Sequence, residues 1–307
     1  MKYIKKAKMY ATRGVVSQMA KMLANASDES LIRMTKMAEK FMVTDIQKKY
    51  VRSTRSIFEQ GHPGLAMIRK LMSRNINPNY HKHLAANLFT NSMLFGYGIR
   101  KEMQKEYGDP PPSFIVISPT MKCNLGCYGC YAGQYKKSEE LDFDTFDRIV
   151  SEAKELGIYF ITISGGEPFT YDKLFDLFEK HDDMVFQIYT NGTLIDEEVA
   201  KKLVKLGNSA PAISVEGYEA ETDARRGEGV YKKVSEAMAR LKDAGALFGF
   251  SATVTRHNID ILSSNEFIDK MIERGCSFGW YFIYIPIGRK PQLDLMPTPE
   301  QRDLLRQ

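Results

Sequence analysis

The sequence predicts an α/β protein, a partial (β/α)6 TIM-like barrel with a helical N-terminal extension. Two observations predict this class. After the prolines at 110–112, short β-branched or aromatic runs alternate with amphipathic helical segments, and such alternation indicates parallel strands joined by helices. Before these prolines, apolar residues recur at helical spacing and strands are hard to find. Three consecutive prolines cannot continue a helix, so they mark a boundary.

Residues 1–110 form a predicted helical, basic and methionine-rich region. They contain 20 Lys and Arg against 8 Asp and Glu, and 11 of the 16 methionines. Ser27 is a plausible cap for a helix whose apolar residues lie in 31–42, and further amphipathic stretches cover 5–24 and 82–106. This region is interpreted as a helical cap on the barrel, as a docking site for a partner or substrate peptide, or as a peripheral membrane contact. No base-stacking motif accompanies the charge, so no nucleic-acid partner is expected.

Residues 111–307 are predicted to form the barrel. The candidate strands are short and rich in β-branched or aromatic residues: Phe114–Ser118, Tyr159–Ser164, Met184–Thr190, Ala210–Val215, Phe248–Thr255 and Trp280–Ile285. The candidate helices between them are amphipathic: Asp142–Leu156, Glu197–Leu206, Tyr231–Ala244 and Ser264–Arg274. A curved parallel sheet of this kind places its active site at the C-terminal ends of the strands.

The two ends of the sequence and its cysteine content are used to predict whether the chain is truncated and where in the cell the protein is located. A last helix is expected from Thr298, with Pro299 at its first position and Gln301 completing a capping box. The sequence stops at Gln307 after about two helical turns, which predicts a truncated C-terminus. The N-terminus lacks the apolar core of a signal peptide, and only four cysteines occur. A cytoplasmic location is therefore predicted.

The most informative motif is the cysteine run Cys123, Cys127 and Cys130, spaced C-x3-C-x2-C. Three thiolates on one loop can hold three irons of a [4Fe–4S] cluster and leave the fourth iron open to a small ligand. The alternative is structural zinc, which usually takes two cysteine pairs, and no second pair is present. Cys276 is expected to be a buried thiol between a helix and the sixth strand.

Polar motifs follow the predicted strands. Gly165, Gly166, Glu167 and Pro168 follow the second strand, Thr190 and Asn191 end the third, and Ser214 and Glu216 end the fourth. Parallel strands bring these motifs to one edge. Glycines there let a ligand approach the backbone, so Gly165 and Gly166 are expected to accept hydrogen bonds from an ammonium group, with Glu167 adding negative charge and Pro168 fixing the turn.

Together these motifs resemble the radical S-adenosylmethionine (SAM) superfamily, from about Pro112 onward. The resemblance implies that Cys123, Cys127 and Cys130 bind three irons, that the amino and carboxylate groups of SAM chelate the fourth iron, and that Gly165, Gly166 and Glu167 take the SAM amino group. It implies that Ser214 and Glu216 lie near the SAM carboxylate or ribose, with Thr190 and Asn191 lining the pocket. One electron from the reduced cluster then cleaves SAM to methionine and a 5′-deoxyadenosyl radical, which abstracts a substrate hydrogen.

The pattern around Cys123–Tyr131, with the stretch from Thr222 to Gly227, is similar to peptide-modifying members with a SPASM-type C-terminal extension. Three departures stand out. Gly129 replaces a commonly aromatic residue that packs near adenine, leaving Tyr128 and Tyr131 as the aromatic candidates. Thr222 replaces a usual histidine. No cysteine cluster follows Cys276, so the auxiliary-cluster domain is expected to be absent from this chain, either truly or by truncation.

The predicted function is that of a radical SAM enzyme acting on a peptide or protein. Alternatives are a lipid or small-metabolite substrate, and a non-catalytic sensor that binds an iron–sulfur cluster or SAM. A flavodoxin or ferredoxin is the expected electron donor. Arg225 and Arg226 are interpreted either as a grip for a carboxylate or as solvent-facing charges.

Overall fold

A computed structural model describes residues 27–42, 45–61 and 75–305. The predicted helical stretch 5–24 lies outside these residues. The chain divides into two compact units, of which the first comprises the residues up to Ile115 together with Asp147–Ile161 and His181–Val185. The second comprises Val116–Phe146, Thr162–Lys180 and the chain from Phe186 onward. A domain boundary near residue 110 stays a prediction.

In the first unit, the helices of the N-terminal residues are α2 (Asp28–Phe41), α3 (Asp45–Glu59), α5 (Pro78–His83), a π-helical stretch (Leu84–Gly96) and α6 (Tyr97–Tyr107). The predicted cap at Ser27 is confirmed, because its side chain accepts a hydrogen bond from the Ser30 N–H. Leu31 and Phe58 are buried together between α2 and α3. The predicted helix 82–106 is confirmed and begins earlier, at Pro78.

Two buried asparagines in the π-helical stretch satisfy backbone carbonyls of the same unit. The Asn87 amide donates to the carbonyls of Asp182 at 2.7 Å and Met184 at 2.9 Å. The Asn91 amide donates to the carbonyl of Asp183 at 2.8 Å. Buried carbonyls need such partners, so these amides fix the turn that precedes the third strand.

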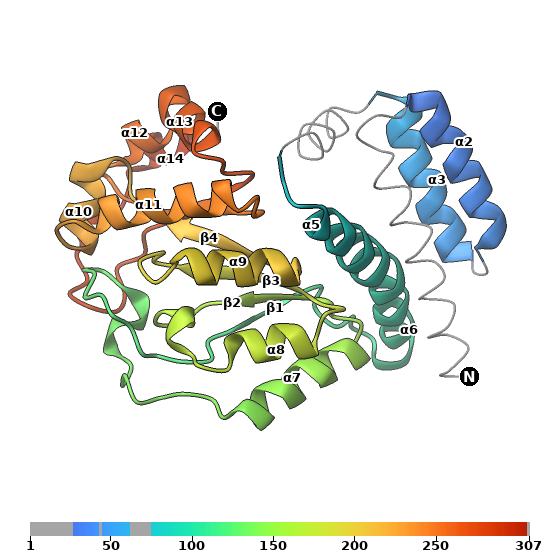
Figure 1. Ribbon diagram of the computed structural model, residues 1–307, viewed down its shortest axis with the longest axis horizontal. Coiled ribbons are helices and arrows are strands. Elements are labelled where there is room, and N and C mark those ends of the chain that lie inside the picture. The colour runs from blue at the N-terminus through green and yellow to red at the C-terminus, as the bar shows by residue number, and fades with distance from the viewer. Residues whose placement is uncertain (1–26, 43–44, 62–74, 306–307) are drawn as a thin grey trace. The chain divides into compact units, whose positions relative to one another are not determined.

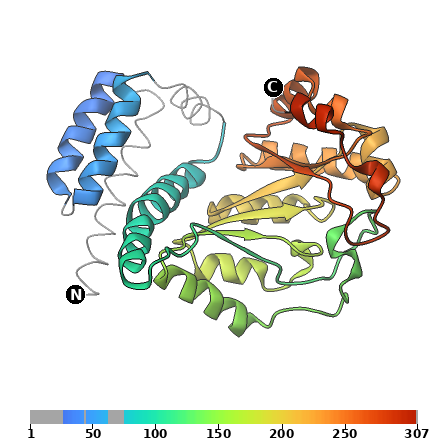
Figure 2. The ribbon, with the colours of Figure 1, turned by 180° about the vertical axis from the view of Figure 1, so that it is seen from behind.

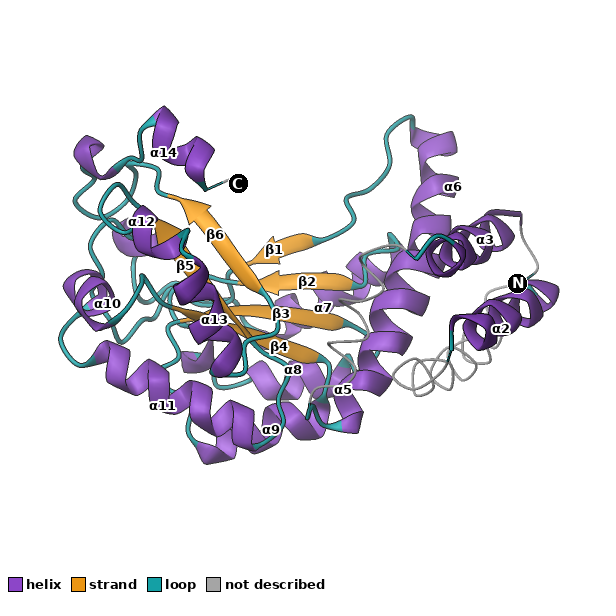
Figure 3. Cartoon of the chain, turned by 90° about the horizontal axis from the view of Figure 1, so that it is seen from above, coloured by secondary structure: helices purple, strands orange, loops and turns teal. Residues whose placement is uncertain are grey.

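The sheet confirms the predicted fold class. Its strands are β1 (Ile115–Ile117), β2 (Phe160–Ile163), β3 (Val185–Thr190), β4 (Ser209–Ser214), β5 (Gly249–Val254) and β6 (Gly279–Ile283). They lie side by side in sequence order, with β1 and β6 at the two edges. Figure 3 shows the strands, in orange, from above. The pairs from β3 to β6 are parallel. The six predicted strands are therefore confirmed to within two residues, and the barrel is open between β1 and β6.

The later helices follow the strands (Figure 1). They are α7 (Phe143–Glu155), α8 (Leu174–Lys180), α9 (Glu197–Leu206), α10 (Glu219–Arg226), α11 (Val230–Asp243), α12 (Ile259–Leu262), α13 (Asn265–Glu273) and α14 (Pro299–Leu304). The four predicted interstrand helices are confirmed as α7, α9, α11 and α13. The capping box at Thr298 and Gln301 is also confirmed. Helices α8, α10 and α12 were not predicted, because each is too short for a periodic apolar pattern.

The core of the second unit lies between the sheet and its helices. Phe186 of β3 packs on Phe178 of α8 with ring centroids 4.5 Å apart, and Phe250 of β5 packs on Phe267 of α13 at 5.5 Å. Cys276 is buried, as expected for a thiol between α13 and β6. No helix in the described part of the chain is long and apolar enough to cross a membrane.

We predict that Phe186→Ala destabilises the protein strongly. The Phe186 side chain is fully buried, and truncating a buried phenylalanine costs about 3–5 kcal/mol through lost burial and a cavity. The measurement is the free energy of unfolding by chemical denaturation. The control Ile272→Ala removes an exposed side chain on α13 and is expected to change it by less than about 1 kcal/mol; equal losses would contradict this packing.

Candidate functional site

The loop that carries the three cysteines begins directly after β1 and is held by the turn that follows β2. The Glu167 N–H donates to the carbonyl of Lys122 at 2.7 Å, and the Gly166 N–H donates to the carbonyl of Thr120 at 3.0 Å. The Met121 N–H donates to the carbonyl of Glu139 at 2.8 Å, which ties the loop to the chain that follows it. These bonds fix the backbone immediately before Cys123.

Gly165 and Gly166 are needed because two backbones meet at this point. A Cβ at Gly165 would lie 2.5 Å from the carbonyl oxygen of Thr120, and one at Gly166 would lie 2.1 Å from that of Lys122. Gly165 also has a φ of +117°, which disfavours any side chain. The adjacent glycines therefore place the end of β2 against the cysteine loop. Both remain partly exposed, and their predicted contact with the SAM amino group stays a prediction.

The segment after β6 forms a second attachment for the cysteine loop. The Arg289 N–H donates to the carbonyl of Cys130 at 2.9 Å, and the Gly129 N–H donates to the carbonyl of Arg289 at 2.8 Å. The Gln134 amide donates to the carbonyl of Gly288 at 2.8 Å. Figure 2 shows this red segment running beside the green loop. This attachment was not predictable from the sequence, since an irregular segment carries no periodic signal.

Gly129 is explained by the same attachment. Its φ is +61°, and a Cβ there would lie 2.7 Å from Cε2 of Tyr284, which follows β6. Tyr284 is itself buried, and its hydroxyl accepts a hydrogen bond from the Gln292 N–H at 3.2 Å. The ring of Tyr284 thus occupies the space that a side chain at position 129 would need.

The three cysteine side chains are partly buried on this loop. The Asn191 amide lies 4.0 Å from the Sγ of Cys123 and donates to Oδ1 of Asn124 at 2.8 Å. Burial raises the pKa of the Cys123 thiol, so a metal must displace its proton. Among the described residues, no three metal-ligating side chains are gathered into a finished site. Three partly buried thiols on a fixed backbone nevertheless form the donor set that an iron–sulfur cluster requires.

Glu167 joins the ends of β2 and β3. Its fully buried carboxylate accepts hydrogen bonds from the Thr190 hydroxyl at 2.7 Å, the Asn191 N–H at 2.7 Å and the Phe169 N–H at 3.1 Å. Burial raises the pKa of Glu167, and these donors oppose the rise. Pro168, also buried, begins a short 3-10 turn (Pro168–Thr170). The structure therefore brings Glu167, Thr190 and Asn191 together through hydrogen bonds among themselves, and their predicted contact with SAM stays a prediction.

Ser214 and Glu216 lie at the end of β4. The Ser214 hydroxyl is 3.2 Å from the hydroxyl of Ser251 on β5. Oε2 of Glu216 accepts a hydrogen bond from the Thr253 N–H at 3.0 Å. The backbone N–H of Glu216 donates to the hydroxyl of Thr222 at 3.1 Å. Thr222 thus supports the strand end at the position where the resemblance expects histidine.

Arg225 and Arg226 grip the carboxylate of Glu216. The Nη1 of Arg225 and the Nη2 of Arg226 both donate to its Oε1, and the Nε of Arg226 donates at 2.8 Å. All three side chains are at most 10 % exposed. The interpretation of these arginines as a carboxylate grip therefore fits the geometry, with the carboxylate supplied by the chain itself, and the solvent-facing alternative is wrong.

Arg225 also faces the cysteine loop. Its carbonyl accepts from the Tyr128 N–H at 3.3 Å. Burial lowers the pKa of its guanidinium, but Glu216, Cys127 and Cys130 outweigh burial and raise it. Its Nε is buried and has no hydrogen-bond partner among the described residues. A buried cation with an unpaired donor beside two thiols suits an anionic cluster or a bound carboxylate.

The two aromatic candidates differ in their surroundings. Tyr131 is 49 % exposed, and its hydroxyl lies 2.8 Å from that of Ser164 at the end of β2. Burial raises the pKa of Tyr128. Asn258 is a further member that no sequence motif indicated, and its amide donates to the carbonyls of Glu216 at 2.9 Å and Thr253 at 3.0 Å.

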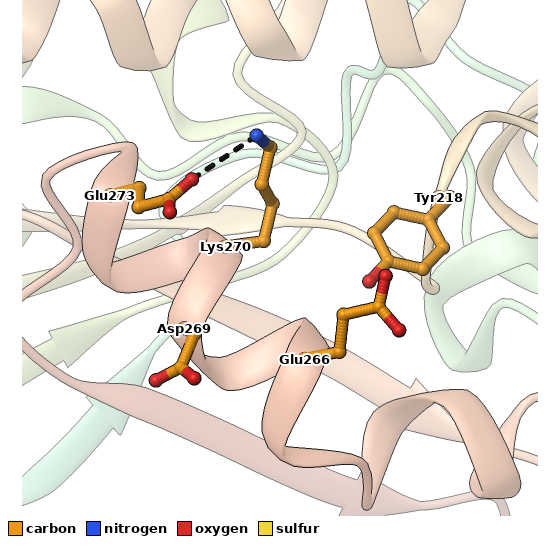
Figure 4. A pocket seen from close by; sticks show the side chains of 5 residues that line it. All are labelled: Tyr218, Glu266, Asp269, Lys270 and Glu273. Atoms are coloured by element: carbon orange, nitrogen blue, oxygen red, sulfur yellow. Dashed lines mark hydrogen bonds and ion pairs between the residues drawn. The ribbon is translucent and has the colours of Figure 1, made fainter.

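A hollow of about 550 Å³ lies elsewhere on the second unit (Figure 4). Its lining is Tyr218 with the α13 side chains Glu266, Asp269, Lys270 and Glu273. Lys270 pairs with Glu273 at 3.2 Å. None of the predicted site residues lines it, so the candidate site is the one at the strand ends.

The comparisons with known proteins point to one superfamily. The sequence profile of the Radical SAM superfamily matches residues 117–254. An AdoMet-dependent heme synthase of Nitratidesulfovibrio vulgaris is 30 % identical, over 60 % of this chain and 51 % of its own length. The mycofactocin maturase MftC of Mycolicibacterium smegmatis is 31 % identical, over 65 % of this chain and 52 % of its own length.

A solved structure shares the fold. Streptococcus suis SuiB bound to S-adenosylmethionine superposes with a TM-score of 0.60 at 18 % identity, over 86 % of this chain and 62 % of that chain. The chain spans about half the length of the curated relatives that it matches.

We predict that Gly129→Ala lowers the iron content of the protein. The new Cβ must displace the Tyr284 ring, which moves the backbone between Cys127 and Cys130. The measurement is iron per chain after anaerobic reconstitution. The control Gly229→Ala has a similar φ of +74° with nothing within 4 Å, so it carries only backbone strain of about 1 kcal/mol. Equal iron loss in both variants would contradict the assignment.

We predict that Glu216→Gln strongly destabilises the protein. It leaves two buried guanidinium groups without their counter-ion, and breaking a buried pair costs about 3–5 kcal/mol. The free energy of unfolding measures this loss. In the control Glu236→Gln, the lost partner is Arg240 in an exposed pair on α11, and such pairs contribute less than about 1 kcal/mol.

Proposed function

The chain belongs to the radical SAM superfamily, with a [4Fe–4S] cluster and SAM as its cofactors, and from this premise we propose that it abstracts a hydrogen atom from a peptide or protein. The observation that carries the radical chemistry is the cysteine loop, whose three thiols lie on a backbone fixed to the ends of β2, α10 and β6. With three protein ligands, the cluster retains one open iron for SAM.

When bound and reduced, a cluster held by these three cysteines would supply the electron for the cleavage of SAM. The residues of this chain position the reactants. Cys123, Cys127 and Cys130 hold the iron, and Gly165 and Gly166 present the end of β2 to the SAM amino group. Glu167 holds Thr190 and Asn191 in place. Arg225, with its unpaired Nε, adds positive charge beside Cys127 and Cys130.

A peptide substrate is supported by the relative named as a mycofactocin maturase, at 31 % identity over 65 % of this chain. The second candidate is a tetrapyrrole, because relatives named as heme synthases match at similar identity. A flavodoxin or ferredoxin is the proposed electron donor, and a cytoplasmic location is proposed with it.

The test is anaerobic reconstitution with iron and sulfide, followed by dithionite and SAM. We expect about four irons and four sulfides per chain and the formation of 5′-deoxyadenosine, measured by liquid chromatography. Cys127→Ala removes one of the three thiolates and is expected to abolish both. The control Cys276→Ala removes a buried thiol outside the loop and is expected to retain both. Zinc in place of iron, or iron retained in Cys127→Ala, would overturn the proposal.

A further inference from the structure

The strand registers define a face of the sheet that carries Ser214 of the candidate site at one end and extends beyond it. The faces are distinguished by Phe186 and Phe250, which point toward α8 and α13. Residues in register on the opposite face are Gln187, Tyr189, Ala210, Ala212, Ser214, Gly249, Ser251, Thr253, Trp280 and Phe282. We call this the interior face. None of these ten residues carries a charge.

Three aromatic side chains dominate the interior face. The central strands β4 and β5 carry small residues there, and these are covered: Ala212 is fully buried and Ser251 is 5 % exposed. Rings from the flanking strands meet over them, since Tyr189 of β3 and Phe282 of β6 lie 5.1 Å apart at 83°. Tyr189, Trp280 and Phe282 are called the aromatic platform. Trp280 and Phe282 are 46 % and 44 % exposed.

The aromatic platform adjoins the candidate site on the same strands. Tyr189 immediately precedes Thr190, whose hydroxyl binds Glu167. Trp280 is in register with Ser251, which contacts Ser214, and Phe282 is in register with Thr253, whose N–H binds Glu216. Neighbouring residues of a strand are about 3.3 Å apart along it. A molecule on the platform therefore lies within a few residues of the proposed SAM site.

We propose that the aromatic platform binds an uncharged aromatic or large aliphatic side chain of the substrate peptide, an inference that rests on the proposed function. A charged side chain would lose hydration on the interior face and find no counter-ion there. An apolar side chain instead covers the exposed faces of Trp280 and Phe282 and gains from their burial.

The geometry favours a side chain over a tetrapyrrole. A macrocycle stacks best on a flat surface, whereas Tyr189 and Phe282 meet nearly at right angles and present an edge beside a ring face. The carboxylates of a tetrapyrrole would also meet no cation among the ten residues of the interior face, and Arg225 and Arg226 at the adjoining site already bind Glu216. Burial raises the pKa of Tyr189 to about 12, so its phenol is neutral at physiological pH and supplies a hydroxyl, with no charge.

The experiment uses Trp280, the only tryptophan of the chain, as a fluorescent reporter. The reconstituted protein with SAM is titrated anaerobically with acetyl-Gly-X-Gly-amide peptides, in which X is Phe, Leu, Lys or Glu. We expect saturable changes of emission with Phe and Leu, and binding about tenfold weaker or worse with Lys and Glu. Coproporphyrin III serves as the tetrapyrrole probe. Equal binding of all four peptides, or none, overturns the proposal, as does tighter binding of the porphyrin that depends on Phe282.

A matched pair of variants locates the binding. Phe282→Ala is expected to weaken binding of the Phe peptide about tenfold, since it removes one ring of the platform. The control Ile283→Ala removes a side chain of similar exposure, 42 %, from the next residue on the opposite face, and is expected to leave binding unchanged. Equal effects of the two variants overturn the platform assignment.

Formation of 5′-deoxyadenosine is measured in the same samples. Selective binding of the Phe peptide without 5′-deoxyadenosine rejects the proposed function and retains the platform. Formation of 5′-deoxyadenosine without selectivity among the peptides rejects the platform and retains the radical chemistry.

Discussion

The site depends on backbone hydrogen bonds that hold the cysteine loop from three directions. The loop receives N–H groups of Gly166 and Glu167 from the end of β2, donates from Tyr128 to the carbonyl of Arg225 at the end of α10, and exchanges bonds with Arg289 after β6. Because main-chain atoms make these contacts, the cysteine side chains stay available for metal. An irregular loop with few side-chain contacts can thereby keep a fixed backbone.

The two buried carboxylates of the site, those of Glu167 and Glu216, are stabilised by partners of different charge. Glu167 accepts only neutral donors, from Thr190, Asn191 and Phe169, and so ties two strand ends together at the cost of desolvating one charge. Glu216 faces two guanidinium groups. The group of Glu216, Arg225 and Arg226 therefore has one excess positive charge next to Cys127 and Cys130. That excess opposes the negative charge of thiolates and sulfides, which favours an anionic cluster in a poorly solvated place.

The sequence was sufficient to predict the strands of the sheet, but it was insufficient to predict the contacts that hold the cysteine loop. The strands were predictable because each is a short apolar run bounded by turns, and the polar motifs were predictable because parallel strands end at one edge. The role of Gly129 was hidden, since its partner Tyr284 lies far along the chain. Gly165 and Gly166 were expected to face a ligand, and their close contact with Thr120 and Lys122 could not be inferred from spacing. Contacts between irregular segments leave no periodic signal.

Because the sheet is open, the proposed substrate has a structural role: it covers the open side of the half-barrel. With β1 and β6 unpaired with each other, the interior face is accessible from the side, and its aromatic platform is left partly exposed. The proposed radical chemistry at the strand ends requires the exclusion of water and of the protein's own side chains. The half-barrel has no sixth-to-first strand pairing to close it, so a bound chain that covers Trp280 and Phe282 completes the enclosure. In the proposed function, binding of an apolar side chain and exclusion of solvent from the candidate site are then the same event.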